Sequence, residues 1–208
     1  MRVFLILNAV LGLMLAGCGG GGANGNSESP VGAGEEPTAA DLGTVIMGRA
    51  DEVVSALEAK DIGRLASLVH PEKGVRFSPY AYVDVETDLT FTSEEVAGLL
   101  DDPETYTWGA FDGSGDPIEW TSAQYFHAFV YPHDYAEAEE VGFNEQLGNG
   151  NTINNISDVY PDGNYVEYHF SGFEEEYEGM DWQSLRLVFE EFEGTWYLVG
   201  IINDEWTI

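Results

Sequence analysis

The spacing of apolar residues predicts two helices at the start of the folded part of the chain. After Asp41, apolar residues recur every three or four positions, which is the spacing of one helix face. Asp61 has the side chain of a helix N-cap and is expected to begin a second, shorter helix. Pro71 ends that helix, because the residue before a proline avoids helical geometry. The residues on the apolar face of the first helix are Leu42, Ile46, Ala50, Val53 and Leu57.

Two later helix starts are marked by capping boxes, in which a Thr and a Glu or Gln three residues later satisfy each other's backbone amides. Thr92 with Glu95 forms the first box, and Thr121 with Gln124 forms the second. Residues 75–85 are rich in β-branched and aromatic side chains, so we expect them to be extended.

Strand-like runs dominate the rest of the chain. Residues 105–111 and 117–120 flank a turn that contains two glycines, and they predict a hairpin. Residues 165–171, 183–192 and 195–203 are three further strand-like runs, and a two-residue Glu-Gly turn joins the last two.

Alternation along these strands predicts which side chains share a face. Leu185, Leu187 and Phe189 fall on one face of their strand, and Glu167 and His169 fall together on the wetter face of the preceding one. The last strand is apolar on both faces, so we expect it to lie mid-sheet and to be covered twice. Its two predicted faces are Trp196, Leu198 and Ile202 on one side and Tyr197, Val199 and Ile201 on the other.

These elements predict an α+β fold in a single domain, with N-terminal helices packed on a curved, mostly antiparallel sheet. The opening, in which residues 56–61 read Ala-Leu-Glu-Ala-Lys-Asp and residues 68–71 read Leu-Val-His-Pro, is similar to the NTF2-like (SnoaL-like) group. That resemblance is specific over residues 44–71 and general for the strands at 164–203. It implies an NTF2-like or cystatin-like cone that is filled with side chains, binds a ligand or holds a catalytic site.

The first seventeen residues have the three parts of a secretory signal peptide. Arg2 is followed by an apolar run over residues 3–15 and by small residues before Cys18. Residues 15–18 read Leu-Ala-Gly-Cys, which resembles the bacterial lipobox. That resemblance implies cleavage before Cys18, acylation of the cysteine with lipid such as palmitate, and a lipid anchor on the extracytoplasmic face of the cell membrane.

The composition divides the remaining chain into two parts. Residues 18–40, which are rich in Gly, Ser and Glu, are expected to be a flexible tether, and residues 41–208 a single acidic domain. Cys18 is the only cysteine, so this domain forms no internal disulfide and relies on its core for stability.

The charge of the chain narrows its possible partners. The sequence has 38 acidic and 7 basic residues, for a net charge of −31. Such a charge repels phosphate backbones and anionic headgroups, so nucleic-acid binding is not expected. Solubility or a salty or alkaline habitat explains the excess most simply, and attraction to a cationic partner or to divalent cations is the alternative.

Motifs for common chemistry are absent from the sequence. It has no phosphate-binding glycine loop, no nucleophile elbow and no His-Glu-x-x-His, and we expect no cofactor. If catalysis accompanies the NTF2-like resemblance, the segments expected to line the pocket supply His127 or Asp84 as base and Tyr80 or Tyr82 as hydrogen-bond donor.

One turn carries a partial calcium-loop pattern. Asp112, Ser114 and Asp116 match the first three ligand positions, but Pro117 stands where the loop needs Gly and Ala123 where it needs Glu. A hairpin turn explains the same residues, so calcium is the minor interpretation and no metal site is predicted.

The anchor, the tether and the lack of a catalytic signature favour a non-catalytic domain that binds a small-molecule or protein ligand. A small-molecule enzyme (isomerase, dehydratase or hydrolase) and an acidic inhibitor or immunity-like protein are the alternatives. A cone packed with side chains argues against the enzyme, whereas a polar cavity of roughly 300 Å³ or more that contains a His or Asp favours it.

Overall fold

A computed structural model of the chain describes residues 39–207, which belong to one compact unit. Cys18, the predicted signal peptide and most of the predicted tether lie outside the described residues. Within residues 39–207, no helix combines the length and the apolar character needed to cross a bilayer. The helices are α1 (Ala39–Glu58), α2 (Ile62–Leu68), α3 (Ser93–Gly98), α4 (Ser122–Tyr125) and α5 (Ile156–Val159), and the shorter turns are η1 (Leu99–Asp101), η2 (Phe126–Val130), η3 (Tyr135–Glu137) and η4 (Glu175–Tyr177).

A six-stranded sheet organises the domain. Its order is β2-β1-β8-β7-β6-β5, with β1 and β8 parallel and every other pair antiparallel. A separate hairpin pairs β3 with β4. The strands are β1 (Val75–Ser78), β2 (Leu89–Phe91), β3 (Thr105–Ala110), β4 (Pro117–Thr121), β5 (Glu140–Phe143), β6 (Asn164–Phe170), β7 (Gln183–Phe192) and β8 (Thr195–Glu205).

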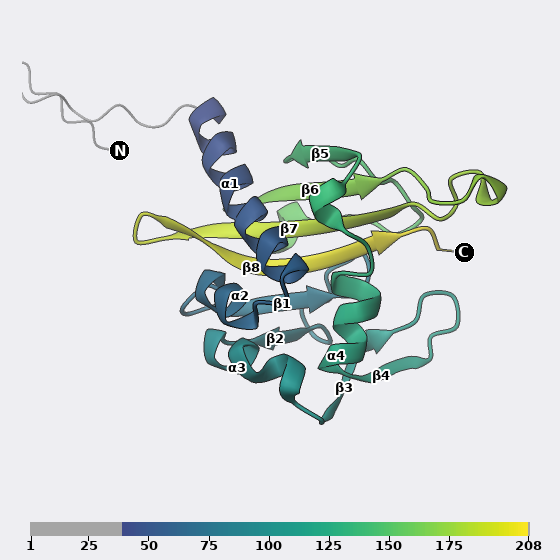
Figure 1. Cartoon of the computed structure of the whole chain (residues 1–208), viewed down its shortest axis with the longest axis horizontal. Coiled ribbons are helices and arrows are strands. Elements are labelled where there is room, and N and C mark those ends of the chain that lie inside the picture. The colour runs from purple at the N-terminus through teal and green to yellow at the C-terminus, as the bar shows by residue number, and fades with distance from the viewer. Residues whose placement is uncertain (1–38, 208) are drawn as a thin grey trace, which may run out of the picture. The chain divides into compact units, whose positions relative to one another are not determined.

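The N-terminal helices cover one face of this sheet, which confirms the predicted α+β class. In Figure 1, α1 lies across the sheet, and α2 and α3 lie beside β1 and β2. The predicted apolar face of α1 is the buried one, since Ile46, Ala50 and Val53 are fully inaccessible to solvent. Asp61 caps α2 as predicted, because its carboxylate accepts a hydrogen bond of 2.9 Å from the Arg64 amide.

Aromatic side chains fill the space between these helices and the sheet. Trp108 of β3 stacks on Tyr125 of α4 with ring centroids 4.0 Å apart, and Phe77 of β1 meets both rings edge-on. Trp108 and Phe77 are fully buried, and Tyr125 is almost so. The cone expected from the NTF2-like resemblance is therefore packed with side chains at its centre.

The opposite face of the sheet is covered by a long irregular segment, residues 144–163, which contains α5. Ile156 and Tyr160 of this segment pack on Val188, Val199 and Ile202 of the two central strands. β8 lies between β1 and β7 and is covered on both faces, which confirms its predicted place in the sheet.

One part of the predicted β8 pattern is wrong. Phe189 pairs with Leu198 but Val188 pairs with Gly200, so Val199 is an extra residue in β8, a β-bulge. Beyond the bulge every side chain changes face. Ile201 therefore joins Leu198 in the core under α1, while Ile202 joins Val199 on the opposite face.

The remaining local predictions are confirmed for the capping boxes and only in part for the strands. Both capping boxes are present, with the Thr92 and Thr121 hydroxyls accepting from the amides three residues on. The extended run predicted over residues 75–85 ends at Ser78, and residues 79–88 form a loop instead. β2 and β5 were not predicted, because strands of three or four residues leave too little alternation to recognise.

Candidate functional site

A cleft of about 530 Å³ opens between the loop that follows β1 and the end of the β3–β4 hairpin. Tyr80, Tyr82 and Asp84 line it from the loop, and Asp112 lines it from the hairpin turn. Three of the four residues proposed from sequence as catalytic candidates, together with one of the calcium candidates, therefore lie around one space.

The rest of the lining is acidic, hydroxylic or apolar. Asp88 adds a third carboxylate, and no Lys, Arg or His lines the cleft. Pro79, Ala110 and Phe111 supply its apolar surface. The other lining residues are Thr87, Thr107, Gly109 and Thr152.

The wall formed by residues 79–88 is held in place by two buried asparagines. Asn155 donates to the Val83 carbonyl at 3.0 Å and accepts from the Val83 amide at 2.8 Å. Asn203 of β8 donates to the Pro79 carbonyl at 3.1 Å. The loop therefore has no regular secondary structure of its own, yet its backbone groups are fixed from outside.

Asp88 closes this loop and is its most perturbed titratable group. The side chain is only 9% exposed and accepts hydrogen bonds from the Ser78 hydroxyl and, at 2.9 Å, from the Asp84 amide. Burial raises the pKa of Asp88 to about 6, although these hydrogen bonds and nearby Arg76 act in the opposite direction. A carboxyl with that pKa in a cleft is available as an acid or a base near neutral pH.

Asp84 and Tyr80 have opposite shifts. The Glu86 amide donates to Asp84 at 3.0 Å, and this hydrogen bond lowers the pKa of Asp84 below its ordinary value. Burial raises the pKa of Tyr80 above its ordinary value. At neutral pH the cleft therefore presents Asp84 as a carboxylate and Tyr80 as a neutral phenol.

A single glycine lets the hairpin approach the loop. Gly109 has φ of +124°, and a Cβ there would lie 3.3 Å from Cγ of Pro79. The β3–β4 register shifts between Thr107 and Ala110, around this glycine. A side chain at position 109 would strain the backbone and press on the cleft wall.

The partial calcium pattern is a hairpin turn in the structure. Gly115 donates to the Phe111 carbonyl at 2.9 Å, and the Phe111 amide donates to the Asp116 carbonyl at 2.8 Å. The Ser114 hydroxyl accepts from the Asp116 amide at 3.2 Å. Over residues 39–207, no three His, Cys, Asp or Glu side chains are grouped so that they could hold a metal ion.

His127 lies apart from the other candidates. It is on η2 and lines a different cleft, of about 420 Å³, together with Lys60 and Tyr131. The structure therefore does not bring the imidazole proposed as a base to Tyr80 or Tyr82, whereas it does bring Asp84 there.

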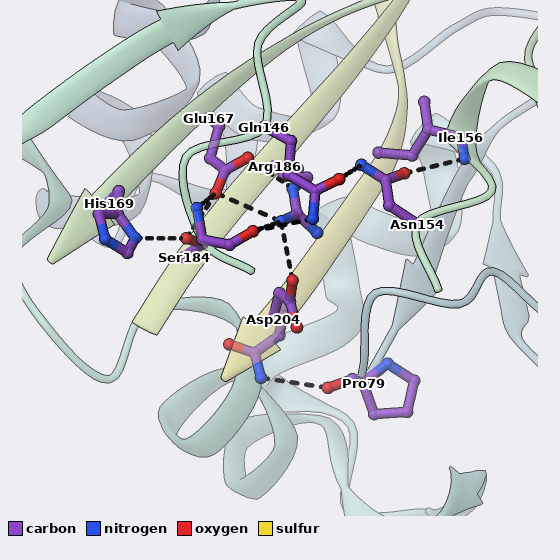
Figure 2. Close-up of polar contacts among 11 residues, drawn as sticks. Pro79, Gln146, Asn154, Ile156, Glu167, His169, Ser184, Arg186 and Asp204 are labelled. Carbon is purple, nitrogen blue, oxygen red and sulfur yellow. Dashed lines mark hydrogen bonds and ion pairs between the residues drawn. The ribbon is translucent and has the colours of Figure 1, made fainter. Parts of the chain in front are cut away.

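A buried ion network is centred on Arg186 (Figure 2). Arg186 of β7 contacts Glu167 of β6 and Asp204 of β8, each at 2.7 Å, and all three side chains are at most 2% exposed. Arg186 also donates to the Gly148 carbonyl at 3.1 Å, while Glu167 accepts from the Gly148 amide at 2.7 Å. The network thus fastens segment 144–163, which carries Asn155, to the sheet.

This network corrects the expected wetter face of β6. Glu167 is fully buried, and His169 is half-buried with Nδ1 2.8 Å from the Ser184 hydroxyl. The prediction was wrong because segment 144–163 covers this face. An arginine between Leu185 and Leu187 was the one sequence signal of a buried charge, whereas no local pattern distinguished Asp88 or Asn155 from surface residues.

Comparisons with known proteins give a distant likeness in structure and none in sequence. No family model matches the chain, and no curated protein matches it either. Aln2 from a Streptomyces species aligns with 10% identity and a TM-score of 0.36, over 82% of this chain and 94% of that chain. A DUF4783 family protein from Bacteroides ovatus aligns with 8% identity and a TM-score of 0.34, over 76% and 94% of the two chains.

A substituted form of Rd1NTF2_05 aligns as well, with 12% identity and a TM-score of 0.29 over 76% of this chain and 96% of that chain. Its name contains that of the fold group which the sequence resembles. Likenesses at these identities and scores carry no activity to this chain, so its function has to be argued from its own residues.

Proposed function

We propose that the chain is a non-catalytic, lipid-anchored protein of the extracytoplasmic face, whose domain binds a small, positively charged ligand in the cleft at Tyr80 and Asp84. The observation that carries this proposal is the lining of the cleft. Three carboxylates and two phenols surround a space of about 530 Å³, and no basic side chain lines it.

The chemistry of the lining fits an organic cation with an apolar part. Asp84 is ionised at neutral pH, and Asp112 is an exposed second carboxylate. Aromatic faces attract cations by about 0.5–2 kcal/mol, and Tyr80 and Tyr82 supply two such rings. Pro79 and Phe111 accommodate hydrocarbon, and the asparagine contacts that fix the loop reduce the ordering needed on binding.

Calorimetry with two ligands of opposite charge tests this site. Benzyltrimethylammonium and benzenesulfonate share a ring and differ in charge. We expect the full chain to bind the ammonium compound with a dissociation constant in the millimolar range or below and not to bind the sulfonate.

The double variant Asp84→Asn, Asp112→Asn should weaken ammonium binding at least tenfold, which corresponds to about 1.4 kcal/mol. His127→Gln, in the other cleft, is the matched control and should leave binding unchanged. Equal binding of both compounds, or an unaltered affinity of the double variant, would contradict the proposal.

The anchor is tested separately. We expect cells given a labelled fatty acid to label the wild-type chain and not Cys18→Ala, because the acyl chains are attached at this sulfur. Fractionation should place the wild type with membranes, since two or more acyl chains are needed for stable anchoring. Label retained by the variant would show that the lipidation assignment is wrong.

A second candidate function is an acid–base enzyme that uses the same cleft. Asp88 favours it, and so do the volume of about 530 Å³ and the Asp lining, which are the features expected above for an enzyme. The raised pKa of Asp88 is close to neutral, so both its protonated and its ionised form are populated near neutral pH, as acid–base catalysis requires. In that case Asp88→Asn would retain ligand binding and lose turnover of the bound compound. Hydrolysis or isomerisation of any bound cation by the wild type, and not by this variant, is the result that would favour the enzyme.

A further inference from the structure

A second cleft lies where the turn between α1 and α2 faces η2. It has a volume of about 420 Å³. Leu57, Ile62, Leu100 and Phe126 give it a largely apolar lining, and all four side chains are buried or half-buried in the main core cluster. The charged or titratable groups around it are Lys60, Glu58, His127, Tyr131 and Asp134.

Lys60 differs from every other Lys and Arg side chain in the described part of the chain. Over residues 39–207, the Lys60 ammonium makes no hydrogen bond and no ion pair, and the His127 ring makes none either. Lys60 is thus an exposed ammonium without an ion-pair partner beside an apolar cleft, in a chain with a net charge of −31. The basic side chains that do have partners are Arg49, Arg64, Lys73, Arg76 and Arg186.

The backbone at Lys60 is strained. Lys60 donates to the Leu57 carbonyl at 3.1 Å, and Asp61 donates to the Ala56 carbonyl at 2.8 Å, which together form a Schellman motif at the end of α1. Lys60 has φ of +53° in the position of this motif that glycine usually occupies. The sequence thus keeps a lysine where glycine would be the more stable choice, and its side chain lines the cleft.

The facing wall is also irregular. The Tyr131 amide donates to the Phe126 carbonyl, five residues earlier, at 2.8 Å, so η2 is a π turn. Such turns occur frequently at functional sites. This one carries His127, while the adjacent Tyr131 hydroxyl donates to Asp134 at 2.7 Å and fixes that carboxylate at the cleft.

We infer that this cleft binds a zwitterionic molecule with an apolar body, of the class of hydrophobic α-amino acids. The apolar lining takes the side chain, Lys60 pairs with the carboxylate, and Glu58 pairs with the ammonium. A purely cationic ligand leaves Lys60 facing a like charge. A purely anionic ligand faces Glu58, Asp134 and the negative field of the whole domain, whereas a neutral zwitterion is not repelled by that field.

Three probes with one phenyl ring separate these possibilities. L-phenylalanine carries both charges, phenethylamine carries only the ammonium, and 3-phenylpropionate carries only the carboxylate. The probes are titrated by calorimetry into the full chain carrying Asp84→Asn and Asp112→Asn, so that the cation cleft proposed above does not bind phenethylamine. We expect L-phenylalanine to bind this chain with a dissociation constant in the millimolar range or below. Each of the other two should bind at least tenfold more weakly.

Two charge-removing variants and one control locate the site. Lys60→Gln and Glu58→Gln should each weaken L-phenylalanine binding at least tenfold. Lys73→Gln removes an exposed lysine that pairs with the buried Glu190 outside this cleft, and it should leave the affinity unchanged.

Lys60→Gly separates binding from folding. Glycine relieves the left-handed strain, so this variant should melt at a higher temperature than the wild type and still bind at least tenfold more weakly. The proposal is overturned if Lys60→Gly keeps the wild-type affinity, if phenethylamine or 3-phenylpropionate binds as tightly as L-phenylalanine, or if neither L-phenylalanine nor L-leucine binds at 50 mM.

Discussion

At the middle of β7, the two faces of the six-stranded sheet are buried by different means. Leu187 and Arg186 are neighbours on β7, and both side chains are fully inaccessible to solvent. Leu187 packs into the aromatic and aliphatic cluster under α1. Arg186 lies under segment 144–163, where Glu167 and Asp204 contact its guanidinium.

The apolar face mainly stabilises the domain, whereas the contacts around Arg186 also position the wall of the Tyr80 cleft. The face under α1 depends on side-chain volume, and many apolar combinations fill such a space. On the opposite face, the part around Arg186 depends on particular partners, because a buried charge that loses its partner is strongly destabilising. The partners on that face are also the ones that fix segment 144–163, and through Asn155 they fix the wall of the Tyr80 cleft.

Arg186→Met should have the largest effect of any single change on that face. It leaves Glu167 and Asp204 buried without a cation and the Gly148 carbonyl without its donor. We expect the free energy of unfolding, measured by urea titration at pH 7, to fall by about 3–5 kcal/mol.

Leu187→Ala is the matched change on the other face and should lower the free energy of unfolding by about 2–5 kcal/mol through the cavity it leaves. The two variants should differ at the cleft. Leu187→Ala should keep wild-type affinity for benzyltrimethylammonium as long as it is folded, while Arg186→Met should weaken it. Identical affinities would mean that the network does not position the cleft wall.

The pH dependence of stability should come from buried carboxyl groups, of which Asp88 is the first. Burial raises the pKa of Asp88 from 3.8 to about 6. A raised pKa stabilises the fold below the unfolded value, and this contribution is lost as the pH rises through the folded value. Between pH 4 and pH 7, the wild type should lose up to about 3 kcal/mol relative to Asp88→Asn, since one pKa unit corresponds to about 1.4 kcal/mol.

The contribution of Asp204 to stability should also fall as the pH rises, because burial raises the pKa of Asp204 to about 6. Asp204 shares the Arg186 guanidinium with Glu167. Urea titrations at half-unit pH intervals measure both effects. A difference between wild type and Asp88→Asn that is constant across this range would show that Asp88 titrates in the folded protein as it does in the unfolded chain.

Asn155→Ala should have an intermediate effect. It leaves the Val83 amide and carbonyl without the partner that holds them, and a buried polar group left unpaired costs about 1–3 kcal/mol. Hydrogen exchange at residues 79–88 should accelerate more than exchange in β7. Uniform acceleration across the sheet would instead indicate that the loop is not held separately by this residue.

The sequence allowed the apolar face to be predicted far better than the polar one. Periodicity and the residue type at a helix start depend only on near neighbours in the chain. They were enough to predict the buried face of α1, the Asp61 cap and the strand faces of β7. The bulge at Val199 exchanged Ile201 and Ile202, since alternation carries no record of an inserted residue.

The candidate site was predicted in part. Tyr80, Tyr82 and Asp84 were placed at a pocket, and the structure brings them together. His127 was grouped with them although it lines another cleft, and Asp88 was overlooked. Both differences arise from tertiary structure, which a local sequence pattern does not record. η2 carries His127 to the cleft beside Lys60, and Ser78 contacts Asp88, whose sequence neighbours look like an ordinary acidic loop.

Thr121→Ala should have the smallest effect, although the capping box was the easiest feature to predict. The Thr121 hydroxyl accepts from the Gln124 amide at the start of α4, which carries Tyr125 into the core. Loss of such a cap lowers the free energy of unfolding by about 0.5–2 kcal/mol.

Thr92→Ala is the control, because it removes the equivalent cap from α3, which buries only Val96. Thermal melting should give a loss of stability within about 0.5 kcal/mol of that for Thr121→Ala. Equal losses would mean that caps act locally, whatever their helix buries. A clearly larger loss for Thr121→Ala would show that this cap also orders the aromatic cluster. The apolar core under α1 would then depend on particular contacts, as the Arg186 network does.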